Sequence, residues 1–266
     1  MSEILNVREL NVTFHDRQSG ERTIKDLSFT LGKGEIMGIV GESGSGKTIT
    51  ALTVIGLLSR KDVTITGQVM FKGKNLIGLN RHDLRQIQGD DIAMIFQEPM
   101  TSLNPVKKVG WQVEEALRLH TDLGKEDRKK RALELMDKVE LDHSVYDKYP
   151  HELSGGMRQR VMIAAAMICD PEILIADEPT TALDVTIQEQ IVELLLKLNK
   201  TQNMAIMFIS HDLSLVRKLC TKVLVMKRGR IVESGKCEKV FNSPQHEYTR
   251  KLIEAIPKIP KKGGVQ

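Results

Sequence analysis

The 266-residue chain is poor in cysteine and in aromatic residues, and it contains no long hydrophobic run. Its three cysteines, Cys169, Cys220 and Cys237, lie far apart without a CxxC pair, which favours reduced thiols over a disulfide framework or a zinc site. No apolar stretch approaches the roughly 20 residues of a membrane-spanning helix, and residues 1–10 lack the apolar segment of a secretory signal. If the protein works at a membrane, other chains must supply the spans.

The charge balance gives no reason to expect a nucleic-acid partner. The chain has 39 basic and 35 acidic residues, and its densest basic stretches, residues 125–131 and 258–262, fit a solvated helix face and a chain end. With 41% hydrophobic and 28% charged residues, the composition is that of a folded domain. The length suits one large α/β domain, or one domain with an insertion.

Short apolar runs alternate with helical patterns along most of the chain. Strands are predicted at residues 4–10, 24–31, 36–40, 67–71, 92–96, 173–176, 205–209 and 223–226. Helices are predicted at residues 47–58, 187–198 and 212–219 and through much of 109–168, where Pro150 is expected to end a helix near Tyr149. This alternation implies a mostly parallel sheet, into which residues 109–168 insert a helical region.

A glycine-rich segment follows the strand predicted at residues 36–40 and precedes a predicted helix. Its sequence, GESGSGKT at residues 41–48, fits the P-loop pattern GxxxxGK[ST]. Backbone N–H groups of such a loop surround phosphate oxygens, Lys47 reaches the β- and γ-phosphates, and the Thr48 hydroxyl ligates Mg²⁺. The predicted nucleotide-binding residues here are Gly41, Glu42, Ser43, Gly44, Ser45, Gly46, Lys47, Thr48 and Ile49.

Two carboxylates follow the strand predicted at residues 173–176. Asp177 is placed to complete the coordination of Mg²⁺, and Glu178 to orient or polarise the attacking water. An Asp-Glu pair after a strand is usually only part of a turn, but beside a P-loop it predicts a catalytic pair. These residues define a P-loop nucleoside triphosphatase without choosing among kinases, GTPases and transport ATPases.

A second helix start discriminates among these classes. Ser154, Gly155 and Gly156 follow Leu153 and open an apolar helix, so their N–H groups form another anion site. A plain helix cap by Ser154 is the alternative. Two phosphate sites on one chain are redundant unless one of them closes on a nucleotide held by the P-loop of a partner.

Taken in order, these motifs resemble those of ATP-binding-cassette (ABC) ATPases from end to end. The resemblance implies an α/β P-loop core with a mostly parallel sheet, an N-terminal antiparallel β subdomain and a helical insertion. It places the nucleotide-binding core at residues 1–108 and 169–243, the helical subdomain at 109–168 and a short tail at 244–266 of a single domain.

The resemblance also implies roles for further residues. Gln97 matches the Q-loop glutamine, His211 the switch histidine, and Asp184, in the segment Ala-Leu-Asp, the D-loop that crosses the dimer interface. Phe14 stands where the family stacks an aromatic ring, usually tyrosine, on adenine, although a core phenylalanine is the alternative. The implied catalytic residues are Glu178, His211 and Gln97, the implied ligands of Mg²⁺ are Thr48, Gln97 and Asp177, and the nucleotide is ATP.

Residues 96–105, 157–160 and 176–184 are similar to the peptide/nickel importer branch of the family. That branch implies an ATPase subunit at the cytoplasmic face of a bacterial membrane, most simply for di- or oligopeptides. Its implied partners are a second, similar but separate ATPase chain, two membrane permease subunits contacted around residues 97–105, and an extracellular solute-binding protein.

Four alternatives to peptide import stay open at this point, one of which is a non-enzymatic ATP-binding regulator. Many peptide members continue into a longer C-terminal segment with cysteines, so the shorter ending here keeps nickel or metal-chelate import as one of them. A soluble ABC ATPase of DNA repair or translation is another, but such proteins usually carry a long coiled-coil insertion or two cassettes. A simple nucleotide or metabolite kinase would leave residues 153–156 and Asp184 without a role.

Overall fold

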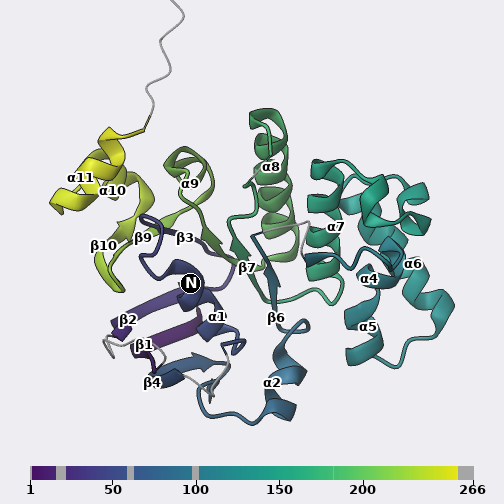
Figure 1. Cartoon of the computed structure of the whole chain (residues 1–266), viewed down its shortest axis with the longest axis horizontal. Helices are drawn as coiled ribbons and strands as arrows, with labels where there is room; N and C mark the ends of the chain where they lie inside the picture. The colour runs from purple at the N-terminus through teal and green to yellow at the C-terminus, as the bar shows by residue number, and fades with distance from the viewer. Residues whose placement is uncertain (1, 16–21, 59–62, 98–101, 182, 257–266) are drawn as a thin grey trace, which may run out of the picture.

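The computed structural model describes residues 2–15, 22–58, 63–97, 102–181 and 183–256, and it contains two β-sheets (Figure 1). Four strands form an N-terminal sheet in the order β2-β1-β4-β5, and six form a central sheet in the order β10-β9-β3-β8-β7-β6. The strands are β1 (Glu3–Phe14), β2 (Arg22–Gly32), β3 (Ile36–Val40), β4 (Val63–Phe71), β5 (Lys74–Asn75), β6 (Ile92–Ile95), β7 (Ile173–Asp177), β8 (Ala205–Ile209), β9 (Lys222–Lys227) and β10 (Arg230–Lys236).

Some helices pack around these sheets, and the others form a lobe at one side of the molecule (Figure 1). The lobe consists of α4 (Val109–Val113), α5 (Glu115–His120), α6 (Lys125–Lys138), α7 (Gly155–Met167) and the short 3₁₀ helices η1 (His143–Asp147) and η2 (Pro150–Glu152). The remaining helices are α1 (Lys47–Val54), α2 (Arg81–Ile87), α8 (Val185–Gln202), α9 (Leu213–Leu219), α10 (Cys237–Asn242) and α11 (Glu247–Glu254). No helix in the described ranges has both the length and the apolar character needed to cross a bilayer.

The central sheet is buried on both faces because its strands alternate between two hydrophobic cores. In β7, Ile173 and Ile175 pack in the core shared with the N-terminal sheet and α1, whereas Leu174 and Ala176 pack against the helices of the opposite face. Strands β3, β6, β7, β8 and β9 run parallel, and only the edge strand β10 is antiparallel. The N-terminal sheet is antiparallel throughout, so the predicted fold class is confirmed.

Several element boundaries differ from the prediction. Helix α1 ends at Val54, four residues earlier than predicted, and β4 begins at Val63. A helix ends near Tyr149 as expected, because η1 ends at Asp147, but Pro150 also begins the next short helix, η2. A proline at the first helical position lacks an N–H that would be unsatisfied there in any case, and it forces the preceding Tyr149 into extended backbone.

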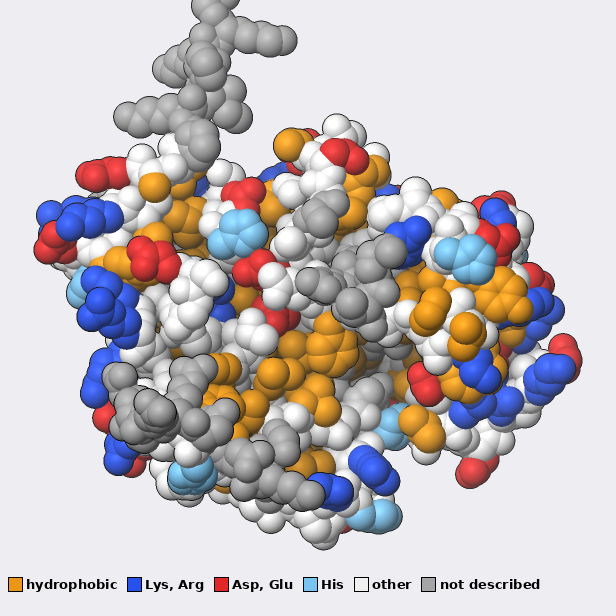
Figure 2. Space-filling model, in the orientation of Figure 1, with side chains coloured by type: hydrophobic (Ala, Val, Ile, Leu, Met, Phe, Trp, Pro, Cys, Tyr) orange, Lys and Arg blue, Asp and Glu red, His pale blue; other side chains and the backbone are white. Residues whose placement is uncertain are grey.

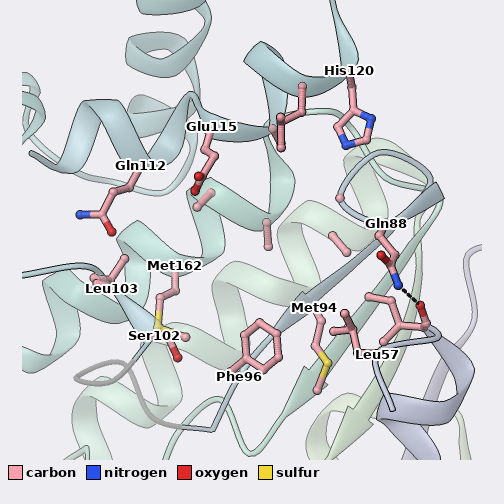
Figure 3. Close-up of a pocket in the computed structure, with 17 residues that line it drawn as sticks. Leu57, Gln88, Met94, Phe96, Ser102, Leu103, Gln112, Glu115, His120 and Met162 are labelled. Atoms are coloured by element: carbon pink, nitrogen blue, oxygen red, sulfur yellow. Dashed lines mark hydrogen bonds between the residues drawn. The ribbon is translucent and has the colours of Figure 1, made fainter. Parts of the chain in front are cut away.

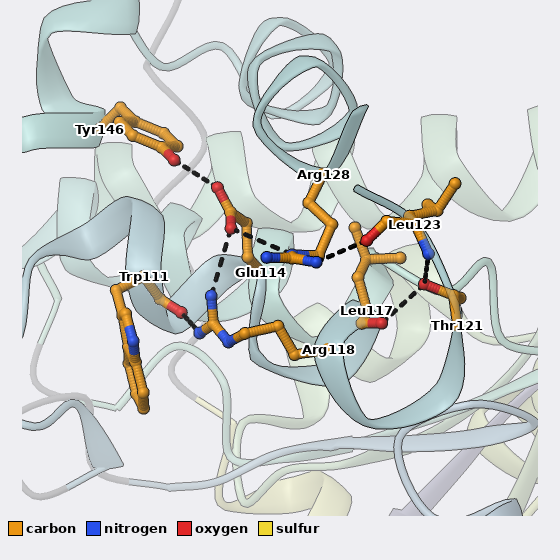
Figure 4. A network of polar contacts seen from close by, with 8 residues as sticks. All are labelled: Trp111, Glu114, Leu117, Arg118, Thr121, Leu123, Arg128 and Tyr146. Atoms are coloured by element: carbon orange, nitrogen blue, oxygen red, sulfur yellow. Dashed lines mark hydrogen bonds and ion pairs between the residues drawn. The ribbon is translucent and has the colours of Figure 1, made fainter. Parts of the chain in front are cut away.

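A buried carboxylate links several elements of the helical lobe through polar contacts (Figure 4). Glu114, at the junction of α4 and α5, lies 3.2 Å from Arg118 and 3.6 Å from Arg128 of α6, and it accepts a hydrogen bond from the Tyr146 hydroxyl of η1. Removing both arginines would leave the buried charge of Glu114 uncompensated, which is strongly unfavourable. The network therefore holds α5 in a fixed position on the lobe.

Candidate active site

The parallel strands bring the predicted site residues to one edge of the central sheet. The P-loop follows β3, Gln97 lies two residues after β6, Asp177 ends β7, and His211 lies two residues after β8. These four strands are neighbours in the order β3-β8-β7-β6, and they all point the same way. Ligand sites of open α/β sheets form at such carboxyl ends, so motifs far apart in sequence converge here.

The P-loop is tightly packed against the strand β9. Gly41 has a φ of +152°, and a Cβ atom there would lie 2.2 Å from the backbone oxygen of Met226, so only glycine fits. The Lys47 ammonium donates hydrogen bonds to the carbonyl oxygens of Gly41 (2.8 Å) and Glu42 (3.1 Å). Burial lowers the pKa of Lys47, and the nearby charges of Glu178 and Asp177 oppose that shift.

Asp177 and Thr48 together present oxygen atoms of the kind that a magnesium ion requires. Asp177 is 2% exposed, and its Oδ1 atom has no hydrogen-bond partner among the residues placed in the structure. The Thr48 hydroxyl hydrogen-bonds to the same carboxylate, whose pKa is raised by burial. A buried carboxylate oxygen without a partner, beside a hydroxyl at the start of α1, fits a hard cation with oxygen ligands.

Glu178 is the point at which polar groups from three strand ends meet. Its Oε2 atom accepts hydrogen bonds from Gln97 Nε2 and Thr181 Oγ1, both at 3.0 Å, and it lies 3.2 Å from His211 Nδ1. The backbone of Glu178 has a φ of +47°, which is uncommon for a non-glycine residue and is found where the surrounding structure enforces it. The structure thus brings together the three residues predicted to be catalytic.

Thr181 is a contact of Glu178 that the sequence analysis missed. It lies three residues after Glu178 in the turn between β7 and α8, and its backbone N–H also donates to the Glu178 carbonyl at 3.2 Å. That spacing is the signal that could have identified it, because a hydroxyl three residues along a turn can reach back to the first residue.

The residues predicted to contact a partner's nucleotide lie at two neighbouring helix starts. The hydroxyl of Ser154 caps α7 by accepting from the Met157 N–H at 3.3 Å, and the Asp184 carboxylate caps α8 by accepting from the Ile187 N–H at 3.0 Å. A Cβ on Gly156 would lie 3.0 Å from the Ile187 side chain, so the two helix starts are closely packed. Among the described residues, no hydrogen bond or ion pair joins these helix starts to the P-loop.

Phe14 ends β1 and packs, partly buried, against the core of the N-terminal sheet. Two residues earlier, Val12 pairs with Ile24 of β2, and the Ile24 side chain closes on Gly46 of the P-loop. The strand next to the one that carries Phe14 therefore borders the P-loop, and adenine stacking by Phe14 stays a prediction. Ile49, in the first turn of α1, is partly buried against the same core.

Some predicted contacts lie outside the described residues. They are residues 98–101 of the segment 97–105, Ala182 beside Asp184, and residues 257–266 of the tail.

The fold and the site define a P-loop ATPase, and Ser154, Gly155 and Gly156 form a second glycine-rich helix start away from the P-loop. The family model "ABC transporter" matches residues 24–181, more than half of the chain, and the model "Oligopeptide/dipeptide transporter, C-terminal region" matches residues 232–266. The chain belongs to the ABC transporter family. It is an ATP-binding ATPase whose hydrolysis is coupled to transport.

Individual relatives extend this similarity over nearly the whole chain. The dipeptide transport ATP-binding protein DppD of Escherichia coli is 46% identical over 258 residues, which cover 96% of this chain and 79% of that protein. The DppD protein of Lactococcus lactis is 47% identical over 260 residues, covering 97% and 74%. The probable peptide ABC transporter ATP-binding protein y4tR of Sinorhizobium fredii is 47% identical over 257 residues, covering 96% and 77%.

Solved structures show the same fold. The ATP-binding cassette MJ0796, in a dimeric post-hydrolysis state bound to ADP and Pi, has a TM-score of 0.78 and 29% identity and covers 88% of this chain and 99% of its own. The cbiO1 protein of Clostridium perfringens, part of the ABC transporter complex cbiONQ, has a TM-score of 0.77 and 29% identity and covers 97% of both chains.

Proposed function

We propose that this chain is the ATP-hydrolysing subunit of a bacterial importer of di- or oligopeptides, bound at the cytoplasmic face of the membrane. The relatives named above are peptide or dipeptide transport proteins, and the C-terminal match is to oligopeptide/dipeptide transporters, which supports peptides over nickel or a metal chelate. The observation that carries the catalytic part is the convergence of Gln97, Thr181 and His211 on the Glu178 carboxylate beside the P-loop.

In the proposed mechanism the P-loop binds the triphosphate and Glu178 acts on water. Lys47 moves from the carbonyl oxygens of its own loop to the β- and γ-phosphates, where its charge offsets theirs. Glu178 accepts a hydrogen bond from the attacking water and turns it toward the γ-phosphate. Gln97 and His211 hold the Glu178 carboxylate in place and sense the γ-phosphate.

We propose Thr48, Asp177 and Gln97 as the residues that would hold Mg²⁺. The partnerless Oδ1 atom of buried Asp177 and the adjoining Thr48 hydroxyl are suitable donors. The ion would neutralise charge on the phosphate oxygens, which is the usual contribution of a metal in phosphoryl transfer.

The proposed catalytic unit is a dimer of two similar but separate ATPase chains. Ser154 and Asp184 are exposed, and Val185 beside them is 73% exposed, although it is a large apolar residue at the start of a helix. A partner surface with a bound nucleotide would cover these groups. Ser154, Gly155 and Gly156 would then seal the γ-phosphate held by the partner's P-loop.

We propose that a membrane subunit binds in an apolar groove between the core and the helical lobe (Figure 3). Its volume is about 520 Å³, and its lining includes Phe96, Leu103, Leu119 and Met162 with Glu115 and His120 at one end. Figure 2 shows hydrophobic side chains gathered on this face between the core and the lobe. The groove includes Ser102 and Leu103 of the segment 97–105, so it supports the predicted contact with a helix of the permease.

The substitution Glu178→Gln tests the catalytic proposal. Gln keeps the shape of the side chain but is a much poorer proton acceptor, so ATP hydrolysis in the assembled transporter should fall by about 100-fold or more. ATP binding should persist, and the closed dimer should accumulate, as measured by size-exclusion chromatography with ATP. Glu189→Gln on the surface of α8 is the matched control and should hydrolyse ATP normally. Near-normal turnover of the Glu178 variant would contradict the catalytic role assigned to Glu178.

The cargo is tested through the partner proteins. The chain, its membrane subunits and the associated solute-binding protein would be reconstituted, and ATPase stimulation measured with di- and oligopeptides and with Ni²⁺. We expect stimulation by peptides. Stimulation by Ni²⁺ alone would replace the peptide proposal with the metal alternative and would leave the ATPase proposal intact.

A further inference from the structure

The C-terminal helix α11 reaches directly into the P-loop. The hydroxyl of Tyr248, in the first turn of α11, accepts a hydrogen bond from the backbone N–H of Glu42 at 3.0 Å, across 206 residues of sequence. Tyr248 is only 6% exposed, and the Lys227 ammonium lies over its ring, 4.6 Å from the centroid. This is a partly buried contact between the tail and the P-loop, and the proposed mechanism does not use it.

The contact holds the peptide unit between Gly41 and Glu42, which also receives the P-loop lysine: its N–H, on Glu42, donates to Tyr248, and its carbonyl, on Gly41, accepts from Lys47 at 2.8 Å. The carbonyl of the next peptide unit, on Glu42, accepts from Lys47 at 3.1 Å and from the Ser45 N–H at 3.2 Å. The first of these peptide units is therefore held by both the tail and Lys47, and the second by the loop itself. The orientation of these peptides determines where the Lys47 ammonium rests and how the following N–H groups face the phosphates.

Tyr248 is itself held in place by a carboxylate on β10. Glu233 accepts hydrogen bonds from the backbone N–H groups of Gln245 (2.8 Å) and His246 (3.0 Å), which fixes the chain entering α11. The His246 ring then caps the helix by accepting from the Tyr248 N–H at 3.0 Å. A continuous set of contacts thus runs from β10 through Tyr248 to Glu42.

We propose that Tyr248 is a positioning residue for ATP, and that α11 is part of the nucleotide site. This inference rests on the proposed ATPase function. The Tyr248 hydroxyl holds the Glu42 peptide in the orientation in which the P-loop receives phosphate, so a tail that leaves its place lowers the affinity for ATP. The tail thereby becomes a region through which a contact elsewhere on the transporter changes nucleotide binding.

The substitution Tyr248→Phe tests this by removing the hydroxyl alone. Phenylalanine keeps the buried ring and its contact with Lys227, so the chain should fold with a nearly unchanged Tm. ATP binding to the full chain, measured by isothermal titration calorimetry with Mg²⁺, should weaken by about 3- to 10-fold, the worth of one neutral hydrogen bond. Amide hydrogen exchange at Glu42 should accelerate, while amides of α11 stay protected.

Tyr146→Phe is the matched control because it also removes a tyrosine hydroxyl from a partly buried hydrogen bond, but in the helical lobe. It should lower Tm and leave the Kd for ATP within about twofold of wild type. If Tyr248→Phe proves unstable, Glu233→Ala carries the test, with exposed Glu238→Ala of α10 as its control. Loosening the entry of α11 should weaken ATP binding in the same direction.

Two results would overturn the proposal. One is that the Tyr248 variant keeps the wild-type Kd for ATP and the wild-type rate of amide hydrogen exchange at Glu42. If the Glu233 variant is used instead, the same result in that variant overturns the proposal. The other is an equal loss of affinity in Tyr146→Phe, which would mark a general effect of stability. In either case a wild-type chain that binds ATP leaves the proposed function standing, whereas a wild-type chain that fails to bind ATP contradicts that function itself.

Discussion

The two regions of this chain that are predicted to bind phosphate differ in how far their contacts are completed within the molecule. Around the P-loop, Lys47 contacts backbone carbonyls, Glu178 has three polar neighbours and Glu42 is bonded to the tail. At the start of α7, the Ser154 hydroxyl makes only its own helix cap among the described residues, and Ser154 and Gly155 are exposed. The difference indicates that folding of a single chain completes the first region, whereas the second region is completed only when a partner chain binds.

The sharpest test of this comparison is Ser154→Ala. If Ser154 contacts the γ-phosphate of a partner's ATP, hydrolysis in the assembled transporter should fall by about 100-fold, as expected when a donor to transition-state charge is lost. Binding of ATP to the isolated chain should stay within about twofold of wild type, because the P-loop region is complete without Ser154. ATPase assays and calorimetry measure the two effects separately.

The substitution also removes a helix cap, and Asn80→Ala controls for this. Asn80 caps α2 by accepting from the Asp83 N–H at 2.9 Å, so its removal reproduces the loss of a cap, which costs about 1 kcal/mol of stability. Equal hydrolysis by the two variants would mean that Ser154 is only a cap. The comparison between the two regions would then fail.

The P-loop region was largely predictable, and the reason is physical. The parallel alternation of strands and helices places the carboxyl ends of β3, β6, β7 and β8 at one edge, so the convergence of Lys47, Gln97, Glu178 and His211 follows once the strands are identified. The backbone of the P-loop is specified locally by its own glycines.

Contacts that depend on distant packing could not be predicted. The bond between Tyr248 and Glu42 requires the tail to fold back across β9 and β10, and no local pattern specifies that. The groove requires the helical lobe to be set against the core by packing, and the network around Glu114 is made of pairs that only the folded lobe brings together. The short helix η2 was not predicted, although a proline can begin a helical turn as well as follow the end of one.

The second test extends the comparison to the apolar groove, which is another surface that we expect a partner subunit to cover. Leu119 of α5 is 75% exposed and lines the groove, so Leu119→Glu should cost little stability but should place a charge in the proposed permease contact. Recovery of the membrane subunits in affinity purification should fall by about tenfold. Leu123→Glu, on the same lobe but outside the groove lining, should leave recovery unchanged. Equal recovery of both variants would place the permease elsewhere.

The smallest expected effect is a shift in the Tm of an Asp177 variant, which should gain stability while it loses activity. Burial raises the pKa of Asp177, so the folded chain disfavours its ionised form. Above the unfolded-state pKa of about 3.9 this lowers stability, and below that value the effect disappears because both states are protonated. Asp177→Asn should therefore raise Tm of the ATP-free chain at pH 7 by on the order of 2 °C, while abolishing hydrolysis.

The gain in Tm should shrink as the pH falls toward 4, which scanning calorimetry across that range would detect. Exposed Asp147→Asn, which loses only a surface ion pair with Lys108, should change Tm by less than about 1 °C. If Asp177→Asn instead lowers Tm at pH 7, the attraction between Asp177 and Lys47 outweighs the cost of burial. The charge of Lys47 would then be enough to stabilise the buried Asp177 carboxylate, whose Oδ1 atom has no hydrogen-bond partner. That result would contradict the assignment of Asp177 as a ligand of Mg²⁺.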